Sequence, residues 1–128
     1  MTEIASYHAH IYYSPATRPI AEGLREQIAA RFSVQLGRWH DRPVGPHATS
    51  MYQVAFAAEL FPTLVPWLMM HRQGLTVLVH PNSGEPYNDH LHNALWLGAV
   101  LPITADQLPR AEAPSAIVPN TQGAAERL

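Results

Sequence analysis

Residues Tyr7–Tyr13, with the sequence YHAHIYY, alternate between two chemically different sets. Successive side chains of a strand point to opposite faces, so this period of two is typical of a strand with one buried face. One set is Tyr7, Ala9, Ile11 and Tyr13. The other is His8, His10 and Tyr12. The pattern predicts a strand that packs its apolar side on a core and carries two histidines on the other side.

The rest of the chain predicts further elements. Apolar residues recur at helical spacing in 16–32, at Ile20, Leu24, Ile28 and Phe32. Glu59–Gln73 also indicates a helix, with Pro66 expected to kink it. Strands are expected at 34–40, 49–56 and 75–80, with an edge strand at 93–101.

This order predicts an α+β fold, a ferredoxin-like antiparallel sheet with two helices on one face and an extra C-terminal strand. Within this sheet, we expect the first strand to run parallel to the third strand and antiparallel to the fourth. Residues 1–108 would form the domain, and 109–128 an extended or disordered tail. The second face of the sheet would need cover, which a homodimer could provide.

Composition narrows the class of protein. A net charge of -2 and scattered basic residues, all arginine, argue against nucleic acid or an anionic membrane as a partner. The chain has no cysteine, which rules out a disulfide framework and thiolate metal ligands. Neither a signal peptide nor an apolar run long enough to span a bilayer is evident, so we expect a cytoplasmic protein.

Histidine is the compositional outlier, with eight residues. In the expected topology, the start of the first strand, the start of the third and the end of the fourth meet at one edge of the sheet. His8 and His10, His47 and His80 occupy these places. Alternation directs the three strand histidines to the face opposite the helices, with His47 within reach from its loop. The sequence therefore predicts a histidine cluster.

Such a cluster is suited to a metal, because imidazole is a common ligand and no thiolate is available. Zn, Mn and non-haem Fe(II) all accept histidine with carboxylate. Asp89 and Glu85 are the candidate carboxylates, and spacing does not choose between them. The alternative is a set of ordinary half-buried histidines without a ligand role.

Other residues have simpler interpretations. His71 is expected to cap the second helix at its C-terminus, where the helix dipole favours a cation. His40 and His92 are interpreted as solvent or loop histidines. Residues 67–70 (WLMM) are expected in the core or a dimer contact. Arg72 could bind a substrate carboxylate or simply be solvated at the helix end.

Several motifs resemble the DOPA 4,5-dioxygenase family of small fungal and bacterial proteins. They are YHAHIYY, GPH before a strand, VPWLMMHRQGLTVLVHPNSG and the following DH…ALWLG, and the similarity runs from about Tyr7 to Pro102. The resemblance implies a dimeric ferredoxin-like protein that cleaves a catechol in an extradiol reaction with O2 and non-haem Fe(II). For L-DOPA the product is a seco-DOPA, which cyclises to betalamic acid or muscaflavin.

The resemblance also implies roles for residues. The matching motifs place histidines at His8, His10, His47, His80 and His90, with Asp89 beside the last. Extradiol chemistry needs a metal with open positions and an acid/base group that works near neutral pH. We assign His8, His10 and His80 as metal ligands and His47 and His90 as acid/base groups. Tyr12, Arg72 and Asp89 are the expected substrate-binding residues. Fe(II) is the expected cofactor, although recombinant protein could carry Zn.

Two alternative functions belong to other classes of protein. A monooxygenase of the dimeric α/β-barrel type shares the fold but does not need four histidines at one edge. A non-enzymatic domain that binds metal or a phenol would load metal without consuming oxygen in the presence of catechols.

Overall fold

The computed structural model describes residues 3–111 and 117–120. A five-stranded antiparallel sheet has the order β2-β3-β1-β4-β5. Its strands are β1 (Ser6–Tyr12), β2 (Gln35–Leu36), β3 (Met51–Ala57), β4 (Val77–Pro81) and β5 (Leu95–Leu97). The helices are α1 (Arg18–Arg31), the 3-10 turn η1 (Ala58–Leu60), α2 (Phe61–His71) and α3 (Pro86–Leu91). The α+β, ferredoxin-like prediction is confirmed, including its extra C-terminal strand.

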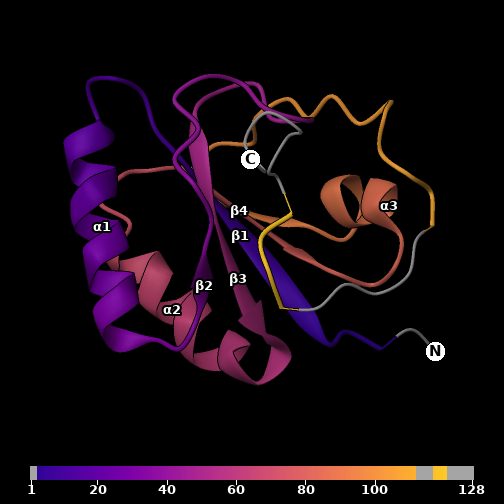
Figure 1. Cartoon of the computed structure of the whole chain (residues 1–128), viewed down its shortest axis with the longest axis horizontal. Helices are drawn as coiled ribbons and strands as arrows, with labels where there is room; N and C mark the ends of the chain where they lie inside the picture. Colours follow the sequence, from indigo (N-terminus) through magenta and orange to yellow (C-terminus); the bar gives the residue numbers. More distant parts are fainter. Residues whose placement is uncertain (1–2, 112–116, 121–128) are drawn as a thin grey trace.

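The sheet separates two layers (Figure 1). Helices α1 and α2 lie on one side of it, and α3 lies on the other. The main core is between the sheet and the first two helices, where Ala9 and Ile11 of β1 pack with Leu24 and Ile28 of α1. Alternation along β1 correctly predicted which side of the strand faces this core. Within α1 the predicted stripe is wrong at Ile20, which is 36% exposed, while Ala21 is buried in its place.

The expected direction of the third strand is wrong. β1 pairs antiparallel with both β3 and β4, so Tyr12 lies opposite Met51 at the start of β3, and His8 lies opposite His80. The reason is the crossover through α1, which returns β2 parallel to β1 and leaves room for one strand between them. β3 then follows β2 as a hairpin and runs against both neighbours.

This reversal changes where the histidines approach. His40 forms a bridge with Met51, so it lies at the Tyr12 end of β1. The loop that carries His47 precedes β3 and therefore reaches the sheet from that same end. The histidines thus come from both ends of β1 and meet along it, instead of gathering at one edge of the sheet.

Two other boundaries differ from the prediction. The strand expected at 34–40 is reduced to β2, which has two residues, and to the isolated bridge of His40. The loop expected at 81–86 leads into α3, a short helix that the periodicity did not indicate. Pro86 occupies its first turn, where the missing N–H of proline has no helical partner to lose.

The face opposite α1 and α2 is covered by this chain itself. Tyr12, Met51 and Leu78 form a second, smaller apolar cluster there, against partly buried Trp96 and Ile103. The expected need for a dimer to cover this face is therefore removed, although the homodimer itself stays a prediction. The predicted tail of 109–128 falls partly outside the described residues. Within the part of the chain that is described, no helix has the length and apolar character needed to cross a bilayer.

Candidate metal centre

Five histidines meet on the face of the sheet opposite α1 and α2. They come from four segments: His8 and His10 from β1, His47 from the loop before β3, His80 from β4 and His90 from α3. His8, His10, His47 and His80 are each at most 2% exposed. These are the five histidines for which a metal or acid/base role was expected, and the structure brings all of them together.

The rings are in mutual contact. Ring centroids lie 4.1 Å apart for His10 and His47, and 4.0 Å apart for His80 and His90. His8 approaches His80 edge-on, with centroids 5.3 Å apart. Such close packing of imidazoles without intervening apolar side chains is unusual for a core, and it points to a shared ligand.

The nitrogen atoms are spaced as metal ligands require. The ligand nitrogens of His8, His10 and His80 lie within 4.8 Å of one another, as do those of His10, His47 and His90. Nε2 of His10 is 3.0 Å from Nε2 of His80. With metal–nitrogen bonds of about 2.0–2.1 Å, two neighbouring ligands of one ion lie roughly 3.0–3.4 Å apart. The His10–His80 pair therefore fits a divalent metal.

Backbone carbonyls prepare two of the rings for coordination. Nδ1 of His80 lies 2.9 Å from the carbonyl oxygen of Pro81, and Nδ1 of His90 lies 2.8 Å from that of Pro86. A carbonyl only accepts, so both Nδ1 atoms carry the proton and a neutral ring keeps its lone pair on Nε2. Metal-binding histidines commonly use such a carbonyl to hold the ring and its tautomer.

His47 is held by Tyr12. The Tyr12 hydroxyl and His47 Nδ1 are 2.6 Å apart, and the tautomer decides which of them donates. Nε2 of His47 and Nδ1 of His10 are buried and have no hydrogen-bond partner among the described residues. Buried imidazole nitrogens without a partner cost free energy, which a metal or a substrate proton would offset.

Burial keeps these rings neutral. Desolvation lowers the pKa of His8 to about 4 and that of His47 to about 3. It also lowers the pKa of His10, His80 and His90, and for His10 and His80 repulsion from neighbouring imidazoles adds to the effect. A metal needs the neutral imidazole, and burial favours this uncharged form of the rings at neutral pH.

Asp89 stabilises the loop beside the cluster. Its carboxylate accepts hydrogen bonds from the backbone N–H and the hydroxyl of Ser83, at 2.8 and 2.6 Å, and from the amide of Asn93 at 3.3 Å. These bonds tie α3 to the end of β4 and so fix His90 against His80. The described contacts of Asp89 are those of a positioning group, and they occupy both of its oxygens.

The other predicted residues lie outside the cluster. Arg72 follows α2 and donates to the carbonyl oxygen of Leu75 at 2.8 Å. The Glu85 carboxylate accepts a hydrogen bond from Asn88 at 2.9 Å. His92 is exposed. His40, expected in solvent or a loop, is instead buried, because its segment pairs with Met51.

Sequence reasoning missed Gln53. It is fully buried in β3, directly opposite His10 on the neighbouring strand, and its amide lies 3.1 Å from Nδ1 of His8. An amide in the middle of the apolar run MYQVAFA was the signal, since a buried polar side chain in a strand needs partners.

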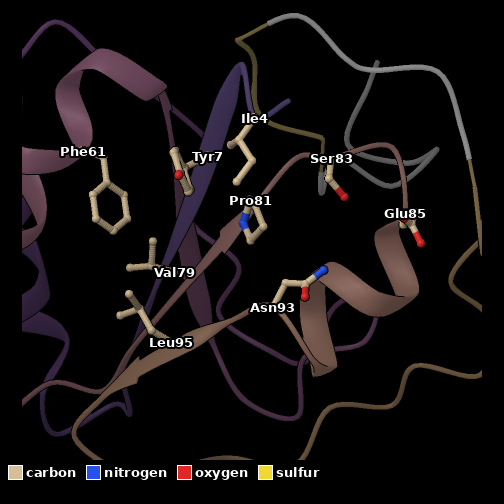
Figure 2. Close-up of a pocket in the computed structure, with 9 residues that line it drawn as sticks. All are labelled: Ile4, Tyr7, Phe61, Val79, Pro81, Ser83, Glu85, Asn93 and Leu95. Atoms are coloured by element: carbon tan, nitrogen blue, oxygen red, sulfur yellow. The ribbon is translucent and has the colours of Figure 1, made fainter. Parts of the chain in front are cut away.

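A cavity of about 480 Å³ is lined by residues of β1, α2, β4 and β5 and by Ser83, Glu85 and Asn93 beside α3 (Figure 2). Its walls are apolar around Tyr7, Phe61, Val79 and Leu95, with Ser83 on a polar side. No histidine is among its lining residues. It is therefore separate from the histidine cluster, although Ser83 joins both through Asp89.

Comparison with known proteins identifies relatives of this chain. It is 32% identical to the DOPA 4,5-dioxygenase of Amanita muscaria over 124 residues, covering 84% of this chain and 54% of that protein. It is also 32% identical to an uncharacterised 21.2 kDa protein of Botryotinia fuckeliana over 117 residues, covering 82% and 64%. The chain thus spans less than two thirds of the length of these relatives.

A solved structure and a family pattern also match this chain. The crystal structure of a proposed dioxygenase from Nostoc punctiforme is 51% identical, with a TM-score of 0.80 over 80% of this chain and 90% of that one. The pattern of the Dopa 4,5-dioxygenase family matches residues 7–107, which include all five clustered histidines. This chain is therefore a member of the Dopa 4,5-dioxygenase family.

Proposed function

We propose that the protein is an extradiol dioxygenase that cleaves a catechol such as L-DOPA with O2 and non-haem Fe(II). The observation that carries this proposal is the cluster of buried imidazoles in which the ligand nitrogens of His8, His10 and His80 lie within 4.8 Å of one another. Family membership supports the reaction class, and the Amanita muscaria relative supports L-DOPA as the substrate.

His10 and His80 would hold the ion, with His8 as the third ligand. His80 has the tautomer that this role requires, fixed by Pro81. All-imidazole coordination without thiolate suits Fe(II) and also accepts Zn(II). When bound, Fe(II) supplies adjacent open positions for catechol and O2 and the electrons that activate O2.

His47 and His90 would handle protons. A catechol must lose a proton on binding, and the ring-opened product must receive one. Nε2 of His47 is buried and has no described partner, so in the tautomer with the proton on Nδ1 its lone pair is available to accept that proton. Tyr12 fixes the direction of the ring through Nδ1. The dry surroundings of these groups strengthen each hydrogen bond that they make.

The reaction inserts both atoms of O2 and breaks the ring bond beside the diol, which leaves an aldehyde and a carboxylate. For L-DOPA cleaved at the 4,5 position, the product is a seco-DOPA that closes to betalamic acid. Cleavage at the 2,3 position leads to muscaflavin by the same type of ring closure. The enzyme would act as a homodimer in the cytoplasm, two further predictions that sedimentation and cell fractionation can check.

The test is reconstitution. Metal-free protein is loaded anaerobically with Fe(II) and mixed with L-DOPA and air, and oxygen uptake is followed with the visible spectrum. We expect a yellow product and one O2 consumed per L-DOPA. Protein loaded with redox-inert Zn(II) is the matched control and should consume none. Bound iron without oxygen uptake, for L-DOPA and a panel of other catechols, would contradict the proposal and favour a metal-binding or phenol-binding domain.

A further inference from the structure

A C-terminal segment crosses the histidine face. Residues 117–120, here called the C-terminal strap, lie on the side of the sheet opposite α1 and α2 (Figure 1, yellow). They are outside the span of the family match, which ends at residue 107. Ile117, Val118 and Asn120 are exposed, so apolar burial is not what holds the strap in place.

Gln53 anchors the strap through both ends of its amide. Its Oε1 accepts a hydrogen bond from the backbone N–H of Asn120 at 2.7 Å, and its Nε2 donates to Oδ1 of Asn120 at 3.0 Å. The same Nε2 lies 3.1 Å from Nδ1 of His8. A fully buried glutamine therefore links the strap directly to a predicted metal ligand.

Gly37 makes room for the strap. A Cβ built on Gly37 would meet the Cβ of Pro119 at 3.2 Å, which is closer than ordinary van der Waals contact. The strap thus sits on the sheet at Gly37 and Gln53, which are neighbours, because the N–H of Gly37 donates to the carbonyl oxygen of Gln53 at 2.7 Å.

The strap also occupies the remaining nitrogen of His8. Nε2 of His8 is 2.9 Å from the carbonyl oxygen of Val118, so this nitrogen carries the proton. Nδ1 must then accept from Gln53, and a neutral His8 keeps no free lone pair. His80 has the opposite tautomer, with Nδ1 protonated and Nε2 available. His8 and His80 face one another across β1 and β4 in different chemical states.

We propose that the C-terminal strap is a built-in competitor of the metal at His8. With the strap seated, His8 is a hydrogen-bond donor and stays outside the coordination sphere. When the strap leaves, Nε2 loses its acceptor at Val118, and Oε1 of Gln53 loses the N–H of Asn120. The Gln53 amide can then turn, and the ring proton moves by exchange with water from Nε2 to Nδ1, where Oε1 of Gln53 accepts it. The His8 ring stays neutral, and its Nε2 lone pair is free to bind the ion. This inference rests on the proposed function, because it regulates the same centre. By linkage, a weaker strap means tighter metal binding, and bound metal loosens the strap.

Asn120→Pro in the full chain tests this. Proline removes both the backbone N–H and the side-chain oxygen that Gln53 holds. Asn120→Ala removes only the oxygen, and Ile117→Ala is the matched control, because Ile117 is an exposed strap residue with no described hydrogen bond. The readout is the dissociation constant for Zn(II), measured by calorimetric titration of metal-free protein.

We expect Asn120→Pro to bind Zn(II) about tenfold more tightly than the unaltered chain, as the loss of two modest hydrogen bonds implies. The Zn(II) affinity of Asn120→Ala should lie between those of Asn120→Pro and the unaltered chain. The affinity of Ile117→Ala should equal that of the unaltered chain. The strap carries no core residue, so these variants are expected to fold. Circular dichroism verifies this.

A second measurement follows His8 itself. Long-range ¹H–¹⁵N correlation spectra report which ring nitrogen carries the proton. Metal-free protein should show His8 protonated at Nε2, and Zn(II) should convert this nitrogen to a metal-bound one. Equal Zn(II) affinity in all variants, or a His8 Nε2–H that persists in loaded protein, would overturn the inference alone. Failure of every variant to bind Zn(II) would overturn the proposed metal centre as well, so the two failures are distinguishable.

Discussion

The two faces of β1 show how one strand can serve two purposes. On the side of α1 and α2, Ala9 and Ile11 are fully buried in an apolar core. On the other side, His8 and His10 are buried just as completely. The first face is covered by two regular helices and the second by α3, loops and the C-terminal strap.

The difference lies in what satisfies the buried groups. Apolar side chains need only close packing, which helices with an apolar stripe provide. Imidazoles need partners for their nitrogens, and backbone carbonyls supply them here: Pro81 at the end of β4, Pro86 in the first turn of α3 and Val118 in the C-terminal strap. Burial of a polar cluster whose partners are in place is therefore an arrangement for binding, whereas burial of apolar side chains under α1 and α2 is one for stability.

The largest effect is expected from breaking the histidine face. His80→Ala should reduce turnover to background and weaken Zn(II) binding at least about 100-fold, since it removes the ligand best prepared by its carbonyl. Far-UV circular dichroism should be unchanged. His10→Ala should behave in the same way, while His92→Ala, an exposed histidine outside the cluster, is the matched control. Full activity in either cluster variant would contradict the proposed site.

Disrupting the apolar face should have the opposite effect: the protein loses stability but keeps its Zn(II) affinity. Phe56 is fully buried in the core and stacks on Tyr7. Phe56→Ala should lower the free energy of unfolding by about 3–5 kcal/mol, through lost burial and the cavity left behind. Zn(II) affinity of the folded protein should be retained. Chemical denaturation measures the free energy of unfolding, and calorimetric titration measures the Zn(II) affinity. A selective loss of metal binding at unchanged stability would show that the two faces are not independent.

The pH dependence of stability in the acid range sharpens the comparison, because the histidines with lowered pKa values all lie on one face. Burial lowers the pKa of His8 to about 4 and of His47 to about 3 from the ordinary 6.5. The unfolded chain therefore binds more protons than the folded one below pH 6.5. The stability from these neutral rings is complete above pH 6.5 and is lost as the pH falls toward 4 and then 3.

Metal-free protein should accordingly lose up to about 1.4 kcal/mol per pH unit for each such histidine in that window. Denaturation curves between pH 7.5 and 4.5 measure this loss. His80→Ala removes one of these rings and should flatten the dependence. A free energy of unfolding that stays constant over this range would show that the rings are charged or exposed in solution.

The smallest effect is expected at a histidine outside both faces. His71 ends α2, where its Nδ1 donates to the carbonyl oxygen of Trp67 and its ring stacks on the indole at 4.3 Å. His71→Ala should cost less than about 1 kcal/mol in unfolding free energy and leave turnover unchanged. A large loss of activity would mean that α2 communicates with the histidine face.

Much of the fold could be predicted because it depends on local pattern. Alternation in YHAHIYY assigned the two faces of β1, and the order of elements indicated the sheet with its two helices. The same alternation placed three of the clustered histidines on one face. Strand direction was wrong for β3 and α3 was missed, because neither a crossover geometry nor a six-residue helix has a periodic signature of its own.

The sequence by itself determined the ligand types, the faces of the strands and the family to which the motifs belong. Only the tertiary structure decided which nitrogen of each histidine is free. That depends on carbonyls and amides contributed by Pro81, Pro86, Gln53 and Val118. Two of these partners are far from their histidine in the chain, and three act through a backbone carbonyl that any residue possesses. Residue identity carries no record of such contacts, so the chemical state of the cluster emerges only when the chain is folded.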